Sequence, residues 1–263
     1  MGGAALHATS RGEGEVTAVG GARPPVGILG WESASNEVTL AQLEQMPGNV
    51  AHPLTFDFPV IYRRVSGACF RTVVLEPNEV VLAANVAAAQ DLEREGAVMV
   101  MTNCGFNALY QRELAASVDV PVVASSLLQV PLVQRTLRPE QRVCVLTADR
   151  EHLTRRHLDG AGITLDCPPY VVGVEETAQF ARIRQDPDAE LDPARFVAEI
   201  VEVGRAQQVA HPEIAAFVLE CTDLPPAAAA LRRATGLPVF DIVTLAQMVY
   251  ESLTGDGWGH PDR

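Results

Sequence analysis

Short apolar runs alternate with longer segments rich in Ala, Leu, Glu and Arg along most of the chain. The apolar runs, rich in Val, Ile and Leu, predict strands at 26–30, 59–65, 97–102, 120–125, 142–147, 170–174, 215–220 and 237–242. The segments between them predict helices near 78–95, 107–117, 126–137, 150–160, 192–209, 225–235 and 243–253. Strands that are apolar throughout and separated by helices are typical of parallel sheets covered on both faces. The pattern therefore predicts an α/β fold with mainly parallel, doubly wound sheets.

The chain also repeats itself at a fixed offset of 117 residues. In each half, a first strand is followed by a cysteine and then by a strand that begins with proline. The corresponding residues are Val26 and Val143, Cys104 and Cys221, and Pro121 and Pro238. Three landmarks at one offset predict two structurally related lobes.

The repeat and the composition together suggest where the lobes begin and end. We expect a first lobe over 24–127, completed by 238–254, and a second lobe over 128–237. Residues 1–23 and 255–263 are expected to be a flexible extension and a flexible tail. The long segment 31–58 has no clear place in either repeat, and it suits a loop over a cleft.

Charge excludes some classes of partner. Among 263 residues, 33 are acidic and 20 basic, so the formal net charge is −13. A field of that sign repels nucleic acid and anionic lipid. No apolar run reaches the roughly 18 residues of a membrane span, and the N-terminus lacks the apolar core of a signal peptide. We expect a cytoplasmic protein whose five cysteines are reduced.

Two of these cysteines occupy equivalent and chemically interesting positions. Cys104 and Cys221 each follow a predicted strand and precede a predicted helix, with Asn107 and Asp223 as the expected N-caps. Ligands of open α/β sheets bind at this edge, where helix N-termini favour negative charge. We therefore expect helix N-termini that lower the pKa of both thiols and hold a carboxylate.

Two thiols facing each other suit one reaction class in particular. Moving a proton from one face of a carbon to the other requires a base on one side and an acid on the other. Two equivalent groups achieve this without a cofactor, provided that fixed hydrogen bonds stabilise the enolate-like intermediate. Candidate donors beside the thiols are Thr102, Asn103, Thr147 and Thr222.

The stretches "VGILG", "TNCGF", "LECT" and "TGLPVFDIVTL" together resemble the aspartate/glutamate racemase superfamily, which includes hydantoin racemases. The resemblance covers the chain from about Val26 to Leu253. It implies two similar α/β lobes related by a pseudo-twofold axis, an active site in the cleft between them, no pyridoxal phosphate and a homodimer. It also implies that Cys104 and Cys221 carry the proton, and that Asn103, Thr147 and Thr222 contact the substrate.

The sequence departs from the superfamily pattern at three places. Trp31-Glu32 replaces small residues after the first strand, "CGF" replaces the common "CNT", and Glu220 stands where glycine is usual. Glu220 would raise the pKa of Cys221 if it faced the site, although strand alternation favours the opposite direction. Gly30, Trp31, Thr102 and Gly105 complete the predicted substrate-binding set.

The resulting hypothesis is a cofactor-independent amino-acid racemase or epimerase that acts at the carbon next to a carboxylate. Two alternatives stay open: a single-thiol decarboxylase or maleate-type isomerase of the same superfamily, and a non-catalytic small-molecule-binding relative. No metal site is expected, because the cysteines and histidines lack ligand spacing. Cys144 is expected in the core, and His152 and His157 on solvated helix faces.

Overall fold

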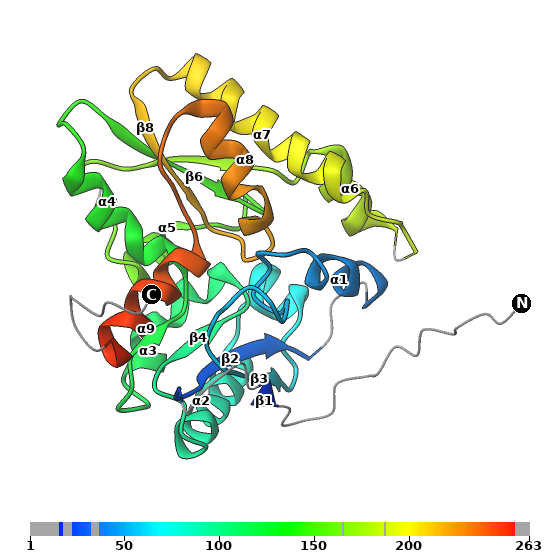
Figure 1. Ribbon diagram of the computed structural model, residues 1–263, viewed down its shortest axis with the longest axis vertical. Helices are drawn as coiled ribbons and strands as arrows, with labels where there is room; N and C mark the ends of the chain where they lie inside the picture. Colours follow the sequence, from blue (N-terminus) through cyan, green and yellow to red (C-terminus); the bar gives the residue numbers. More distant parts are fainter. Residues whose placement is uncertain (1–15, 18–22, 33–36, 165, 187, 256–263) are drawn as a thin grey trace, which may run out of the picture.

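The computed structural model describes residues 16–17, 23–32, 37–164, 166–186 and 188–255. In this part of the chain, nine strands form two sheets, one in each lobe (Figure 1). The fold is the expected α/β architecture with mainly parallel sheets and flanking helices. Most of the predicted N-terminal extension and C-terminal tail lies outside the described residues.

The first sheet has the strand order β1-β3-β2-β4-β5. Its strands are β1 (Val16–Thr17), β2 (Val26–Trp31), β3 (Val60–Val65), β4 (Val100–Thr102) and β5 (Val122–Val123). β1 pairs with β3 in antiparallel orientation, and the other neighbours are parallel. The helical elements of this half are α1 (Glu37–Glu44), η1 (Arg71–Leu75, a π-helix), α2 (Glu79–Arg94), η2 (Gly105–Tyr110, a 3₁₀-helix) and α3 (Gln111–Ala115).

The second sheet has the order β7-β6-β8-β9 and is parallel throughout. Its strands are β6 (Arg142–Thr147), β7 (Tyr170–Gly173), β8 (Ile214–Leu219) and β9 (Val239–Phe240). The helical elements from here on are η3 (Ser126–Gln129, a 3₁₀-helix), α4 (Val130–Thr136), α5 (Arg155–Gly160), α6 (Ala178–Gln185), α7 (Pro193–Ala210), α8 (Pro225–Thr235) and α9 (Ile242–Thr254).

The helix boundaries follow from local capping chemistry. The side chain of Asn78 accepts a hydrogen bond from the backbone N–H of Val81 and so caps α2, and Asp192 caps α7 in the same way. Asp241 and Thr244 form a capping box that opens α9. α8 ends at Gly236, whose φ of +71° is the left-handed conformation that glycine adopts without strain. These local signals place the ends of the crossover helices.

The pairing of strands repeats with the predicted offset. Residues Gly27 and Ile28 pair with Val100 and Met101, and 117 positions later Cys144 and Val145 pair with Phe217 and Val218. The pairs of β4 with β5 recur in the same way between β8 and β9. The internal repeat is therefore a repeat of sheet register as well as of sequence landmarks.

The last helix of each repeat crosses to the other lobe. α4 follows β5 of the first sheet, but Val130 and Val133 pack in one cluster with Val143 and Val145 of the second sheet. α9 follows β9, and its apolar face packs against β2 and β4. The prediction that 238–254 completes the first lobe is therefore wrong for β9, because β9 pairs with β8. The helix alone crosses, which ties the two lobes together.

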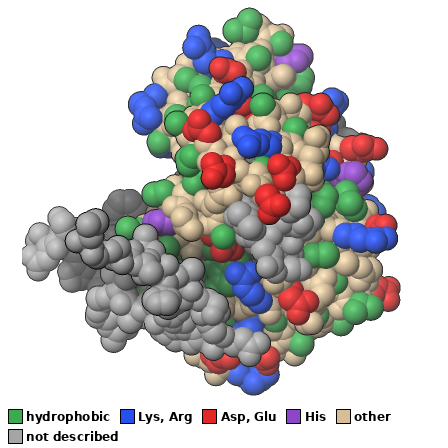
Figure 2. Space-filling view, turned by 90° about the vertical axis from the view of Figure 1, so that its right-hand side faces the viewer, with side chains coloured by type: hydrophobic (Ala, Val, Ile, Leu, Met, Phe, Trp, Pro, Cys, Tyr) green, Lys and Arg blue, Asp and Glu red, His purple; other side chains and the backbone are tan. Residues whose placement is uncertain are grey.

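The segment between β2 and β3 contributes to the junction of the lobes. Leu43 and Met46 pack in the core cluster of the second sheet, although they precede β3 of the first. Helices α1 and α6 and the π-helix η1 were not predicted from the sequence. No helix in the described ranges is long and apolar enough to cross a membrane. On the face in Figure 2, acidic and basic side chains are interspersed.

Candidate functional site

A cavity of about 300 Å³ lies where the carboxyl ends of both sheets meet. It is lined from both lobes and from the segment between β2 and β3. Its lining residues are Trp31, Leu43, Glu44, Asn49, Val50, Tyr62, Phe70, Val74, Asn103, Cys104, Phe106, Ala148, Phe180, Arg184, Glu220, Cys221, Thr222 and Asp223. A volume of this size fits a small molecule.

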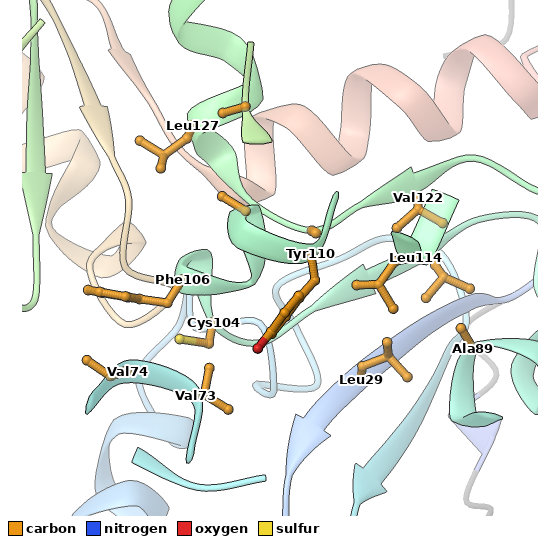
Figure 3. Close-up of a cluster of buried hydrophobic side chains, with 14 of the residues drawn as sticks. Leu29, Val73, Val74, Ala89, Cys104, Phe106, Tyr110, Leu114, Val122 and Leu127 are labelled. Atoms are coloured by element: carbon orange, nitrogen blue, oxygen red, sulfur yellow. The ribbon is translucent and has the colours of Figure 1, made fainter. Parts of the chain in front are cut away.

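Both predicted thiols line this cavity. Cys104 occupies the N-cap position of η2 and is 9% exposed. It lies between the ring of Phe106 and the side chains of Val73 and Val74 (Figure 3). Cys221 follows β8 and is partly exposed. The lobes thus bring the two cysteines to one cavity, and their catalytic roles stay predictions.

The resting thiols differ from the expectation. Burial raises the pKa of Cys104 well above its ordinary value, and the nearby Glu220 carboxylate raises it further. Burial, Asp223 and Glu220 raise the pKa of Cys221 in the same way. The backbone N–H groups of Phe106 and Asp223 act in the opposite direction, as the helix-terminus argument predicted, but they are outweighed. Both sulfurs are therefore protonated at neutral pH in this environment.

Three of the predicted contact residues line the cavity. Trp31 lies edge-on to Phe70, with 6.4 Å between the ring centroids. Asn103, with its amide oriented to satisfy its neighbours, donates to Leu29 O and accepts from the Trp31 N–H and the Tyr62 hydroxyl. The hydroxyl of Thr222 donates to the backbone carbonyl of Asn103 and so joins the two cysteine loops. These bonds hold the walls of the cavity in position.

The other four predicted contact residues lie behind the walls rather than in them. Thr102 is buried and donates to Cys104 O and Ala124 O, at 2.9 and 2.8 Å. Gly30 packs under the Tyr62 ring, which leaves no room for a Cβ. Thr102 and Gly30 thus lie behind the cavity lining, where internal groups occupy their surroundings, and their predicted contact with a substrate stays a prediction.

Thr147 and Gly105 are likewise turned away from the cavity, toward Glu220. The hydroxyl of Thr147 donates to Glu220 Oε2 at 2.8 Å. A Cβ on Gly105 would overlap Glu220 Oε1 and the Glu220 backbone carbonyl. Both residues accommodate the buried carboxyl group of Glu220, and their predicted contacts with a substrate stay predictions.

Two carboxylates reach the cavity against expectation. Glu220 is 0% exposed, and burial raises its pKa to about 7. Asp223 does not cap α8, whose N-cap is Leu224. Instead it accepts from the Asn49 amide at 2.7 Å and lies 3.8 Å from Cys221 Sγ. Burial raises the pKa of Asp223 to about 6.

Aromatic rings and one guanidinium complete the lining. The rings are those of Trp31, Tyr62, Phe70, Phe106 and Phe180. Arg184 is the one basic side chain among the described lining residues, and it pairs with Asp149 at 3.1 Å. Its guanidinium carbon lies 5.1 Å from the centroid of the Phe70 ring. Because three carboxyl groups (Glu44, Asp223 and Glu220) and one arginine line it, the cavity is acidic as well as aromatic.

Other predictions around the site have mixed outcomes. Cys144 lies in the core, as expected. His157 is 2% exposed rather than solvated, because its ring caps the start of α5 through Thr154 and packs edge-on against Phe106. Asn107 lies inside η2 and not at a helix N-cap. The residue that opens η2 is Cys104 itself.

Curated relatives of this sequence share one activity name. A dimethylsulfoniopropionate lyase of Durusdinium sp. clade D is 31% identical over 207 residues, which are 76% of this chain and 68% of that protein. Dimethylsulfoniopropionate lyase 6 of Emiliania huxleyi (strain CCMP1516) is 33% identical over 215 residues. That match covers 78% of this chain and 56% of the relative. No family model matches the sequence.

Solved structures with a similar fold come from racemases and a decarboxylase. A mutant of arylmalonate decarboxylase superposes with a TM-score of 0.57 at 20% identity, over 89% of this chain and 94% of that one. Aspartate racemase of Picrophilus torridus superposes with a TM-score of 0.54 at 15% identity, over 88% of this chain and 94% of that one. Allantoin racemase of Pseudomonas fluorescens superposes with a TM-score of 0.55 at 17% identity, over 87% of this chain and 90% of that one. At these identities the likeness shows the fold.

Proposed function

Because this chain belongs to the family of the dimethylsulfoniopropionate lyases, within the Asp/Glu/hydantoin racemase superfamily, we propose that it is a lyase of a small sulfonium-bearing carboxylate. In the proposed reaction, a base removes the proton from the carbon next to the carboxylate of dimethylsulfoniopropionate. The adjacent carbon–sulfur bond then breaks, and its electron pair stays with sulfur. The products are acrylate and dimethyl sulfide, with one proton left on the enzyme. The racemase hypothesis shares the first step, removal of the proton from the carbon next to the carboxylate.

The observation that carries the proposal is the presence of two thiols on one acidic, aromatic cavity. One of them, Cys104 or Cys221, serves as the base once it is ionised. The protein surroundings alone keep both thiols protonated. A cationic sulfonium bound beside them favours the thiolate, since an opposite charge within a few ångströms lowers a thiol pKa. A substrate that carries its own positive charge thus activates the base that attacks it.

The lining suits a sulfonium cation. Aromatic faces attract such cations by roughly 0.5–1 kcal/mol at exposed sites and by about 2 kcal/mol when water is excluded. The carboxylates of Glu44 and Asp223 lie on the same cavity as the rings of Trp31 and Tyr62. Burial of these groups strengthens their attraction for a cation relative to water. An uncharged thioether analogue gains none of this attraction.

The substrate carboxylate has one basic partner on the cavity wall. The guanidinium of Arg184 has five N–H donors, and one of them is hydrogen-bonded to the carboxylate of Asp149. The remaining donors suit a carboxylate, which guanidinium groups bind with two parallel hydrogen bonds. Binding of the carboxylate at Arg184 and of the sulfonium among the rings would orient the carbon between them toward the thiols.

The test is product release by purified variants. We expect the wild-type protein to release dimethyl sulfide from dimethylsulfoniopropionate. Cys104→Ser and Cys221→Ser should each lower turnover by at least ~10²-fold, because general acid–base groups supply about 10²–10⁴-fold. Cys69→Ser, a partly buried cysteine outside the cavity lining, is the matched control and should retain full activity. Wild-type protein that releases no sulfide would reject the lyase.

A second candidate is the racemase or epimerase of the same superfamily. The observation in its favour is that both thiols line one cavity, as a two-base exchange requires. It predicts exchange of the α-hydrogen of an amino acid for solvent deuterium, with inversion and without loss of a group. Formation of acrylate without inversion of any amino acid in a substrate panel would exclude it.

A further inference from the structure

Glu220 has a buried carboxyl group in which one oxygen accepts a side-chain hydrogen bond and the other has no hydrogen-bond partner among the described residues. It follows the last residue of β8 and is 0% exposed. Thr147 donates to Oε2 at 2.8 Å, and the backbone of Ala148 also donates to the carboxylate. Oε1 has no hydrogen-bond partner among the described residues. An unpaired buried oxygen costs free energy, so its retention at a cavity suggests a use.

The free oxygen lies between the two cysteine loops. Glu220 precedes Cys221 in the chain, and Oε1 lies where a Cβ of Gly105 would be. Gly105 in turn follows Cys104. In agreement with this position, the charge of Glu220 raises the pKa of both thiols. One carboxyl group therefore faces both predicted proton carriers.

The lyase reaction requires a group that takes a proton from the catalytic thiol after each turnover. This step rests on the proposed function. Dimethylsulfoniopropionate is a zwitterion, whereas its products are a neutral sulfide and a monoanion, so each turnover leaves one proton on the enzyme. A thiol that has taken this proton must lose it before the next turnover. In a racemase the second thiol returns a proton to the substrate, and no such loss is needed.

We propose that Glu220 accepts this proton from the cysteine thiol and passes it toward solvent. The S–H bond breaks and its electron pair stays on sulfur, while the proton forms an O–H bond at Oε1. The protonated carboxyl then releases the proton to water, and no other reactant takes part. The resting pKa values oppose this transfer, but a sulfonium bound beside the thiol lowers the thiol pKa, and a carboxylate that is part ionised near neutral pH can then accept the proton.

The surroundings of Glu220 set when it is ionised. The titratable and charged groups that face it are Cys104, Cys221, Asp223 and Asp149, the last of which pairs with His152 and Arg184. Burial is the main cause of its raised pKa, and the two aspartates add to it. Burial is the main cause that keeps both resting thiols protonated, and the ionised Glu220 adds to it. The same residue thus lowers resting thiol reactivity and speeds proton loss during turnover.

These two effects make Glu220→Gln a sharp test, because they have opposite signs. The amide keeps the shape of the side chain, and Thr147 can still donate to its oxygen. Alkylation of Cys104 and Cys221 by iodoacetamide, measured by mass spectrometry from pH 6 to 9 without substrate, should become faster, about tenfold for each unit by which the thiol pKa falls. Turnover should fall ~10–100-fold and lose its pH dependence near 7. Glu202→Gln, on the exposed face of α7, is the control and should change neither the rate of alkylation nor the turnover.

Each outcome decides between the proposals. A variant with unchanged alkylation, or with unchanged turnover and pH profile, overturns the proton-acceptor role while leaving the lyase intact. Alkylation and turnover that both slow down indicate a merely structural role and also overturn it. Wild-type protein without sulfide release rejects the lyase itself, and the proton-acceptor role with it.

Discussion

The two cysteine loops share one backbone plan but differ in one functional group. Asn103 and Glu220 are 117 positions apart and immediately precede Cys104 and Cys221. The Asn103 amide oxygen accepts from the Trp31 N–H, and the Glu220 carboxylate accepts from the backbone of Ala148, which is the repeat equivalent of Trp31. One loop therefore carries a neutral amide where the other carries a titratable carboxyl. The repeat supplies two thiols, and this difference makes them inequivalent.

The largest effect is expected when the amide is made into a second carboxylate. In Asn103→Asp, the donor to Leu29 O is lost and a carboxylate faces that carbonyl beside Cys104. A partly buried charge that faces a carbonyl oxygen should lower the free energy of unfolding by about 3 kcal/mol at pH 8. The loss should shrink at pH 5, where the carboxyl is protonated. Urea denaturation at the two pH values measures it, and equal losses at both would contradict the explanation.

The next effect concerns the space beside the free oxygen of Glu220. Gly105→Ala places a methyl group against Glu220 Oε1 and its backbone carbonyl, whereas the repeat-equivalent position is Thr222, which already carries a side chain. We expect a loss of about 2 kcal/mol, typical of overpacking, measured by thermal unfolding. Thr222→Ala, which removes the bond to Asn103 O, should lose only about 1 kcal/mol. A Gly105→Ala protein as stable as wild type would place Glu220 elsewhere.

The pH dependence of stability isolates the buried carboxyl. The pKa of Glu220 is about 7 in the folded protein against an ordinary value of 4.5. The folded state therefore keeps a proton that the unfolded chain loses, and stability falls as pH rises from about 4.5 to 7. Glu220→Gln should remove this loss and gain roughly 2 kcal/mol at pH 8. At pH 4 the variant and the wild type should be equally stable by denaturant titration.

The smallest effect concerns the donor to Glu220. Thr147→Val removes the hydroxyl that favours the ionised form of Glu220, so the pKa of this carboxyl should rise further. If Glu220 shapes the acid limb of the pH–rate profile, that limb should move to higher pH by about half to one unit. Thr136→Val on α4, away from the cavity lining, is the control. An unshifted pH–rate profile would show that the ionisation of Glu220 does not control the turnover rate.

The sequence predicted the scaffold better than the lining of the cavity. β2, β6 and β8 are buried along nearly their whole length, and such strands give a continuous apolar signal. The offset of the repeat then located Cys104 and Cys221 on equivalent loops. These features are local or periodic, so they are visible in one sequence.

The lining was missed where it depends on tertiary contacts. Glu220 was expected to point away by strand alternation, but β8 ends at Leu219 and the rule does not apply beyond it. Tyr62, Phe70 and Arg184 come from separate segments with no shared motif, and only folding brings them together. Asp223 has the residue type of a helix cap, but the amide of Asn49 binds it instead. In each case a distant partner overrides the local signal.

The product balance of the wild-type protein distinguishes a lyase from a racemase. Dimethylsulfoniopropionate is added in weakly buffered solution, acrylate is followed by NMR, dimethyl sulfide by gas chromatography and the released proton by pH-stat titration. We expect one acrylate, one sulfide and one proton for each substrate consumed, with turnover lost in Cys104→Ser and in Cys221→Ser. Exchange of the α-hydrogen with solvent but without acrylate or proton release would contradict it.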